Sequence, residues 1–138
     1  MNAWRLLLTR PAPESAALAA TLAAQGVFSS SLPLLQIEAL AETAEQRELI
    51  LALPRYSAVI VVSKPAARIA LDLLDAHGLQ SLSMPWFSVG AATAQILRDH
   101  GLDVHFPADG DDSEALLQLS RLREAVARPG AQVLILRG

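Results

Sequence analysis

The sequence predicts an α/β fold with a doubly wound parallel sheet, and three observations support this prediction. Short apolar runs alternate with longer segments of helical period along the whole chain. Gly26, Gly78 and Gly101 each follow a helical segment, in the position of a left-handed helix cap. The run at 58–62 is apolar on both faces, which is typical of a parallel strand covered by helices on both sides.

The first part of the chain is expected to form one strand, two helices and an extended segment between them. Residues 6–8 form the first strand, because this apolar run is too short for a signal peptide or a membrane span. Helices are expected at 13–25 and 41–53. The extended segment at 31–37 contains Pro33, which suits an edge or a linker and not a central strand.

The second part repeats the unit of strand and helix. After the strand at 58–62, a helix at 65–76 should bury a stripe made of Ala66, Ile69, Ala70, Leu73 and Leu74. The next expected elements are a strand at 86–89, a helix at 91–100, a strand at 104–106, a helix at 112–122 capped by Ser113, and a strand at 132–136. Right-handed crossovers place every strand-to-helix turn at one edge of such a sheet, where open α/β folds bind ligands.

The composition excludes several classes of protein. Hydrophobic residues make up 52% of the 138 residues and charged residues 18%, which excludes a disordered chain. The absence of cysteine removes disulfides, thiolate catalysis and cysteine zinc sites, and fits a reducing compartment. The formal net charge is -3 and Lys64 is the only lysine, so nucleic-acid binding is disfavoured. We therefore expect a cytoplasmic protein that binds neither membranes nor nucleic acids.

Four turns on the expected ligand edge lead into helix N-termini, where unpaired N–H groups and the helix dipole favour an anion. These turns lie at 9–11, 63–65, 90–93 and 107–113. Thr9, Ser63, Thr93 and Ser113 would add hydroxyl donors, and Arg10, Lys64 and Arg137 would add positive charge. A helix cap is the simpler explanation for any one of these hydroxyls. Several such turns on one edge, with mostly basic charges, favour a site for a polyanion.

Metal and nucleotide sites have weaker support. Asp109, Asp111 and Asp112 suggest a metal loop, but no calcium motif is complete, so a solvated loop is the better interpretation. The three histidines lack the spacing of a zinc pair, and surface or packing roles are expected for His77, His100 and His105. No glycine-rich motif of a dinucleotide or nucleotide-phosphate site is present. Packing roles are also expected for Trp4 and Trp86.

The sequence around these turns resembles the uroporphyrinogen-III synthase family, in order and spacing across the whole chain. The matching pieces are Leu6-Leu7-Leu8-Thr9-Arg10-Pro11, Ser63-Lys64-Pro65-Ala66-Ala67, Phe87-Ser88-Val89-Gly90-Ala91-Ala92-Thr93-Ala94, Pro107 followed by Ser113-Glu114-Ala115-Leu116-Leu117, and Val133-Leu134-Ile135-Leu136-Arg137-Gly138. The ordered set is what points to the family, since no single piece is diagnostic.

The resemblance implies a two-lobed protein whose chain starts in one α/β lobe, crosses to a second and returns. Residues 1–30 would be the first βα unit of lobe 1, residues 31–40 a linker strand, and residues 41–138 most of lobe 2. Gly138 directly follows a strand that no helix covers, so we expect a fragment or a truncated product in which the remainder of lobe 2 is absent.

The resemblance also implies a lyase of tetrapyrrole and haem biosynthesis. The family cyclises hydroxymethylbilane to uroporphyrinogen III, with inversion of ring D and loss of water, and uses no cofactor or metal. Holding this flexible polycarboxylate in a folded shape can supply several kcal/mol by pre-organisation alone. The expected partners are the substrate and, transiently, hydroxymethylbilane synthase. The full-length protein is expected to be a monomer, and this piece alone is expected to be inactive.

The matching motifs also imply site residues. Thr93 is implied as a cleft hydroxyl and is the one candidate catalytic residue. The expected substrate-binding residues are Thr9, Arg10, Ser63, Lys64, Gly90, Ala92, Thr93, Ser113 and Arg137. Two departures matter. Val62 stands where many relatives have a hydroxyl, and Tyr56 does not match the tyrosine often proposed to assist departure of the hydroxyl, so no proton donor is assigned.

Two other functions stay open at this point. A two-lobed binding or sensor module for small anions would keep the same turns without catalysis, and a failure to turn over hydroxymethylbilane would favour it. A structural α/β domain would use the hydroxyls only as helix caps. Alanine at Thr93 and Ser113 would then lower stability by about 1 kcal/mol each without any effect on a ligand.

Overall fold

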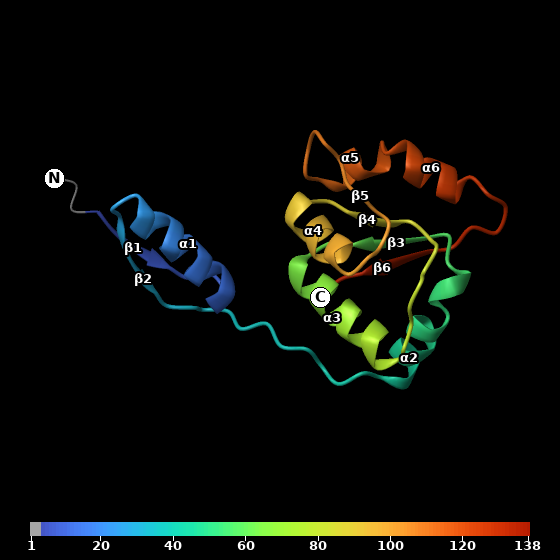
Figure 1. The fold of residues 1–138 in the computed structure, drawn as a ribbon, viewed down its shortest axis with the longest axis horizontal. Helices are drawn as coiled ribbons and strands as arrows, with labels where there is room; N and C mark the ends of the chain where they lie inside the picture. The colour runs from blue at the N-terminus through green and yellow to red at the C-terminus, as the bar shows by residue number, and fades with distance from the viewer. Residues whose placement is uncertain (1–3) are drawn as a thin grey trace. The chain divides into compact units, whose positions relative to one another are not determined.

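The computed structural model describes residues 4–138, so the first three residues of the expected lobe 1 lie outside it. The chain divides into two compact units, Met1–Leu40 and Ala41–Gly138. Each unit has its own parallel sheet with helices packed on it (Figure 1). The α/β class predicted from the sequence is therefore confirmed.

The first unit is a single strand–helix–strand motif. It contains β1 (Arg5–Leu8), α1 (Ala12–Ala24) and β2 (Phe28–Ser31), and the two strands pair in parallel. Gly26 follows α1 with φ +74°, a conformation that glycine adopts without steric cost, so the expected helix stop is confirmed. Trp4 is 68% exposed, and its expected packing role is wrong in this structure.

The expected linker strand at 31–40 is not a strand beyond Ser31. Two backbone hydrogen bonds continue the pairing beyond Ser31, from the Leu32 nitrogen to the Leu8 oxygen at 2.8 Å and from the Leu34 nitrogen to the Thr9 oxygen at 3.1 Å. Pro33 lies between these two donors and has no N–H group to donate, which interrupts a regular ladder. The expectation of a strand is therefore wrong, while the role of the segment as a linker stays a prediction.

The second unit is built on a sheet of four parallel strands in the order β5–β4–β3–β6. Its strands are β3 (Ala58–Val61), β4 (Trp86–Ser88), β5 (Val104–His105) and β6 (Val133–Leu136). All three neighbouring pairs are parallel, as the continuous apolar run of β3 predicts, and all four residues of β3 are buried.

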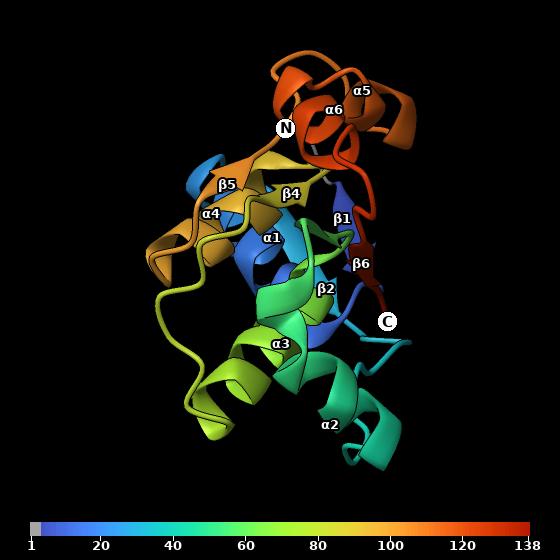
Figure 2. The same ribbon diagram turned by 90° about the vertical axis from the view of Figure 1, so that its right-hand side faces the viewer.

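Helices cover both faces of this sheet, as expected for a doubly wound fold (Figures 1 and 2). One face packs against α2 (Ala44–Leu51), the 3-10 helix η1 (Leu53–Arg55), α3 (Lys64–Ala76) and α4 (Ala91–Asp99). The other face packs against α5 (Ser113–Leu117) and α6 (Ser120–Val126). None of the helices within residues 4–138 has the length and apolar character needed to cross a bilayer.

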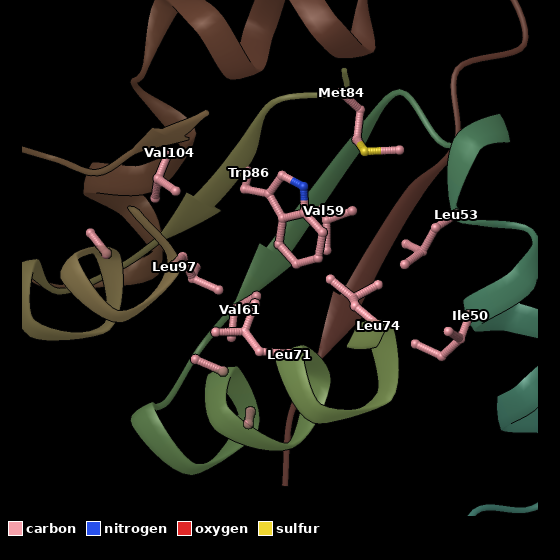
Figure 3. Close-up of a cluster of buried hydrophobic side chains, with 13 residues drawn as sticks. Ile50, Leu53, Val59, Val61, Leu71, Leu74, Met84, Trp86, Leu97 and Val104 are labelled. Carbon is pink, nitrogen blue, oxygen red and sulfur yellow. The ribbon is translucent and has the colours of Figure 1, made fainter. Parts of the chain in front are cut away.

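The larger core cluster lies between the sheet and α2, α3 and α4. The fully buried Trp86 ring is at its centre, which confirms the expected packing role of this tryptophan (Figure 3). The buried residues of α3 are Ala66, Ala67, Ala70, Leu71 and Leu74. The expected stripe is thus partly wrong, because Ile69 and Leu73 are only half-buried.

The single helix expected at 112–122 is wrong, since this region forms the two short helices α5 and α6. Leu119 between them has extended backbone angles, φ -63° and ψ 122°. The Arg123 side chain donates to the Leu117 carbonyl at 3.1 Å, which satisfies an acceptor at the end of α5. The expected Ser113 cap is also wrong, because the Asp112 carboxylate accepts the Ala115 N–H at 2.8 Å.

Candidate functional site

The carboxyl ends of the strands in the second unit gather several of the predicted site residues at one edge of the sheet. Since all four strands are parallel, Ser63, Gly90 and Arg137 all follow strands at this edge. The loop at 107–112 also begins there, after β5. Thr9 and Arg10 are exposed and follow β1 in the first unit. Their grouping with the residues of the second unit stays a prediction.

The N-terminus of α4 is the strongest candidate for an anion site at this edge. Gly90 is its N-cap residue and provides no side-chain cap, and the first turn contains no acidic residue. The first hydrogen bond within the helix is made by the Ala94 nitrogen to the Gly90 oxygen at 3.1 Å. The N–H groups of Ala91, Ala92 and Thr93 therefore precede the hydrogen-bonded helix, where they can bind an anion.

The neighbouring N-terminus of α3 offers fewer donors. The Ser63 hydroxyl accepts the Ala66 N–H at 3.2 Å, which confirms that this serine is a helix cap. Pro65 has no N–H group. Lys64 is the first residue of α3 and is half-buried, so it places a positive charge beside the edge. At this turn the charge of Lys64 is therefore a better reason to expect an anion than the backbone is.

The other two predicted turns already contain carboxylates of their own. In α5, which has only five residues, Asp112 caps the helix and Glu114 lies in the first turn, next to the exposed Ser113. In α1 of the first unit, Glu14 lies in the first turn and Pro13 removes one N–H donor. A carboxylate at a helix N-terminus satisfies its dipole and repels a second anion. These two turns are poorer anion sites than the sequence predicts.

Thr93 adds a hydroxyl to the N-terminus of α4. Its side chain is 7% exposed, yet within residues 4–138 its hydroxyl makes no hydrogen bond. Among the fully buried polar atoms of this part of the chain, Trp86 Nε1 and His105 Nε2 make no hydrogen bond, although His105 Nε2 lies 3.0 Å from the Asp103 carboxylate. The Thr93 oxygen is not one of them, so a ligand or a water molecule can reach it. Helix side chains lean toward the N-terminus, which points this hydroxyl to the same side as the N–H donors.

The approach to this turn is open. A Cβ atom placed on Gly90 would meet no other atom within 4 Å, and Ala92 is exposed. The N–H groups, the Thr93 hydroxyl and this open space together suit one carboxylate group of a ligand. Arg137 at the end of β6 is exposed and can add charge at the same edge.

One polar residue beneath the site was not predicted from the sequence. Ser88 is fully buried at the end of β4, and its hydroxyl donates to the Gly90 carbonyl at 3.0 Å. The signal that could have revealed it is a hydroxyl inside the otherwise apolar run 86–89.

Two of the three histidines, His77 and His100, lie at the C-terminal ends of helices, away from the α4 N-terminus. His77 Nε2 lies 2.7 Å from Glu42 and His100 Nε2 lies 3.1 Å from Asp75, both beside the C-terminal ends of helices. His105 packs on Phe87 with 5.6 Å between ring centroids. Surface and packing roles are thus confirmed. Within residues 4–138, no three or more His, Asp or Glu side chains are arranged to hold a metal ion.

A hollow of about 340 Å³ lies at the opposite edge of the sheet, between the turns that follow α3 and α4. Asp75, Gln80 and His100 are among its lining residues. Asp75 and His100 already pair with each other, and the other polar lining residues are Gln80 and Ser81, so this hollow contains no helix N-terminus of the kind found at α4.

Comparisons with known proteins show which family the chain is similar to. A model of the uroporphyrinogen-III synthase HemD family matches residues 16–138. A uroporphyrinogen-III synthase of Salmonella typhimurium (strain LT2) is 34% identical over 135 residues, which cover 96% of this chain and 54% of the relative. The chain therefore spans about half the length of that curated relative.

Solved structures of Thermus thermophilus uroporphyrinogen III synthase show the same fold. One has a TM-score of 0.50 and 24% identity, over 96% of this chain and 61% of that structure. A mutant form has a TM-score of 0.59 and 23% identity, over 97% of this chain and 61% of that structure. From the match of the family model over most of its length, the chain belongs to the uroporphyrinogen-III synthase family.

Proposed function

We propose that the protein containing this chain cyclises hydroxymethylbilane to uroporphyrinogen III, as a lyase of tetrapyrrole biosynthesis. Membership of the family supports this function. The single structural observation behind it is the uncapped N-terminus of α4, where the nearly buried Thr93 hydroxyl makes no hydrogen bond within the described chain. The acetate and propionate groups of a linear tetrapyrrole are the kind of ligand that such a site binds.

The role of the site in this proposal is to hold the substrate in shape. One carboxylate of the bilane binds the N–H groups of Ala91, Ala92 and Thr93 and the Thr93 hydroxyl, while Ser63, Lys64 and Arg137 face further carboxylates. Fixing several carboxylates at once limits the shapes of a flexible chain and brings its ends together, which lowers the entropic part of the barrier. Ser113 has less support as a contact, because Asp112 and Glu114 surround it.

The proposal also covers the arrangement of the whole protein. Residues 1–30 would belong to lobe 1, residues 31–40 would be a linker, and residues 41–138 would form most of lobe 2. Thr9 and Arg10 would then bind substrate from lobe 1, and the protein would work as a cytoplasmic monomer. Transient contact with hydroxymethylbilane synthase would deliver the unstable substrate.

The product isomer tests this function. The protein expressed from its complete gene is given freshly generated hydroxymethylbilane, the products are oxidised, and type I and type III porphyrins are separated by chromatography. A dominant type III isomer is expected. Type I alone, the spontaneous product, from a well-folded protein would reject the proposal and favour an anion-binding module without catalysis.

A further inference from the structure

A buried serine lies beneath the candidate anion site. Ser88 is 0% exposed and ends β4, after the equally buried Trp86 and Phe87. Burying a hydroxyl among apolar side chains costs free energy unless it forms a hydrogen bond. An apolar residue would therefore suit this strand end better if packing alone decided the choice.

The hydrogen bond of Ser88 connects the strand to the start of the helix. Its hydroxyl donates to the Gly90 carbonyl at 3.0 Å, and the same carbonyl accepts the Ala94 N–H at 3.1 Å. Gly90 has the largest backbone freedom of any residue type and no side chain to restrict it. The Ser88 hydroxyl therefore limits the orientations that the N-cap residue of α4 can adopt.

We propose that Ser88 is a positioning residue of the anion site, an inference that rests on the proposed function. It touches no ligand itself. It acts through Gly90 to keep the N–H groups of Ala92 and Thr93 and the Thr93 hydroxyl directed at one carboxylate. Pre-organised donors bind an anion without the entropic cost of ordering them first.

A second buried serine lies beside a strand-to-helix turn, in the first turns of α1 in the first unit. Ser15 is also 0% exposed, and its hydroxyl donates to the Arg10 carbonyl at 2.8 Å, in the turn between β1 and α1. With Thr93, these serines are the buried polar side chains of residues 4–138. Each of the three lies at or beside a strand-to-helix turn of its own unit.

The test is steady-state kinetics of Ser88→Ala in the protein expressed from its complete gene, with hydroxymethylbilane as substrate. Loss of one neutral hydrogen bond should raise KM about fivefold. The value of kcat should fall less than KM rises, because the other carboxylate contacts still hold the bilane folded and the main loss is in substrate affinity. Ser88→Thr keeps the hydroxyl, so its KM should stay close to the wild-type value.

Thr43→Ala is the matched control for lost stability. It removes the hydroxyl that caps α2 by accepting the Gln46 N–H at 3.1 Å, without touching the anion site. It should lower the melting temperature and leave KM unchanged. If Ser88→Ala does not fold, Ser88→Cys carries the same expectation, since a thiol is a weaker donor of similar size. The inference is overturned, and a purely structural role shown, if KM of Ser88→Ala equals that of the wild type. The same follows if folded Ser88→Thr has a KM as high as that of Ser88→Ala.

A second measurement separates this inference from the proposed function. The affinity of the 138-residue chain for uroporphyrin III is followed by the fluorescence anisotropy of the porphyrin. Ser88→Ala should weaken this binding about fivefold. If the wild-type protein makes no type III product, the proposed function fails. The affinity for uroporphyrin III then decides by itself whether Ser88 positions the anion site. Equal affinities of wild type and Ser88→Ala overturn the inference whatever the outcome of catalysis.

Discussion

The Nε2 atom of His77, at the C-terminal end of α3, lies 2.7 Å from the Oε1 atom of Glu42, which precedes α2. Only 12% of the His77 side chain and 24% of the Glu42 side chain are exposed. The pair therefore fixes the start of the second unit onto α3, beside the helix cap that Thr43 and Gln46 form.

Glu42→Ala should lower the free energy of unfolding of the second unit by about 1–2 kcal/mol, because a mostly buried hydrogen bond is lost. Urea titration in a Trp4→Phe background measures this, with fluorescence of the buried Trp86 as the probe. Asp75→Ala breaks the more exposed pair with His100 and should cost about 0.5 kcal/mol or less. If Asp75→Ala lowered the free energy of unfolding more than Glu42→Ala, the claim that the less exposed pair stabilises the unit more would be contradicted.

Thr93→Val should leave stability nearly unchanged and weaken ligand binding. The two side chains have similar shape, and the hydroxyl makes no hydrogen bond within the described chain, so the change in stability should stay within about 0.5 kcal/mol. Affinity for uroporphyrin III should fall about tenfold, since a hydrogen bond to a charged group is lost. Thr93→Ser keeps the hydroxyl and should bind nearly as wild type. Equal binding by Thr93→Val would remove this residue from the site.

Gly90→Asp should abolish the anion site while keeping the helix. Gly90 has extended angles, φ -112° and ψ 153°, and room for a Cβ atom, so an aspartate can cap α4. Its carboxylate would occupy the N–H donors, and affinity for uroporphyrin III should fall about tenfold or more at an unchanged or raised melting temperature. Gly90→Ala supplies the control, because it adds only a methyl group. Binding that survives in Gly90→Asp would place the ligand elsewhere.

Asp112→Ala should lower stability by about 1 kcal/mol, because Asp112 is the N-cap of α5. Ser113→Ala should change it by no more than about 0.5 kcal/mol, because no hydrogen bond of this hydroxyl exists within residues 4–138. Thermal unfolding followed by circular dichroism compares the two variants. The opposite order would restore Ser113 as the cap.

The strands of the second unit and their parallel pairing could be predicted because their signals are local, whereas β2 (Phe28–Ser31) was not among the predicted strands. The apolar run of β3 and the glycines after the helices each report on a few neighbouring residues. The break between α5 and α6 could not be predicted, since it depends on how Leu116 and Leu122 reach the same core cluster. The stripe of α3 was partly misplaced for the same reason, because contacts with α2 and α4 decide which side of a helix is buried.

The sequence predicted the set of turns that form the candidate site, but it did not predict which turn is the best place for an anion. Hydroxyl and basic residues at strand ends can be read directly from the sequence. The sequence does not reveal which helix N-termini are already capped. This depends on whether a side chain such as Asp112 or Ser63, or no side chain, accepts the first N–H groups of the helix. The hydrogen bond from Ser88 to Gly90 was equally hidden, since it depends on the backbone path of the turn.

The most direct test of the account is an amide-resolved NMR titration of the 138-residue chain with uroporphyrin III. The central claim is that the N-terminus of α4 binds a carboxylate of the ligand. The largest shifts should then appear at the N–H groups of Ala91, Ala92 and Thr93, and they should vanish in Gly90→Asp. Shifts confined to the hollow at 79–82 and 100–102, or to the N-terminus of α5, would contradict the claim.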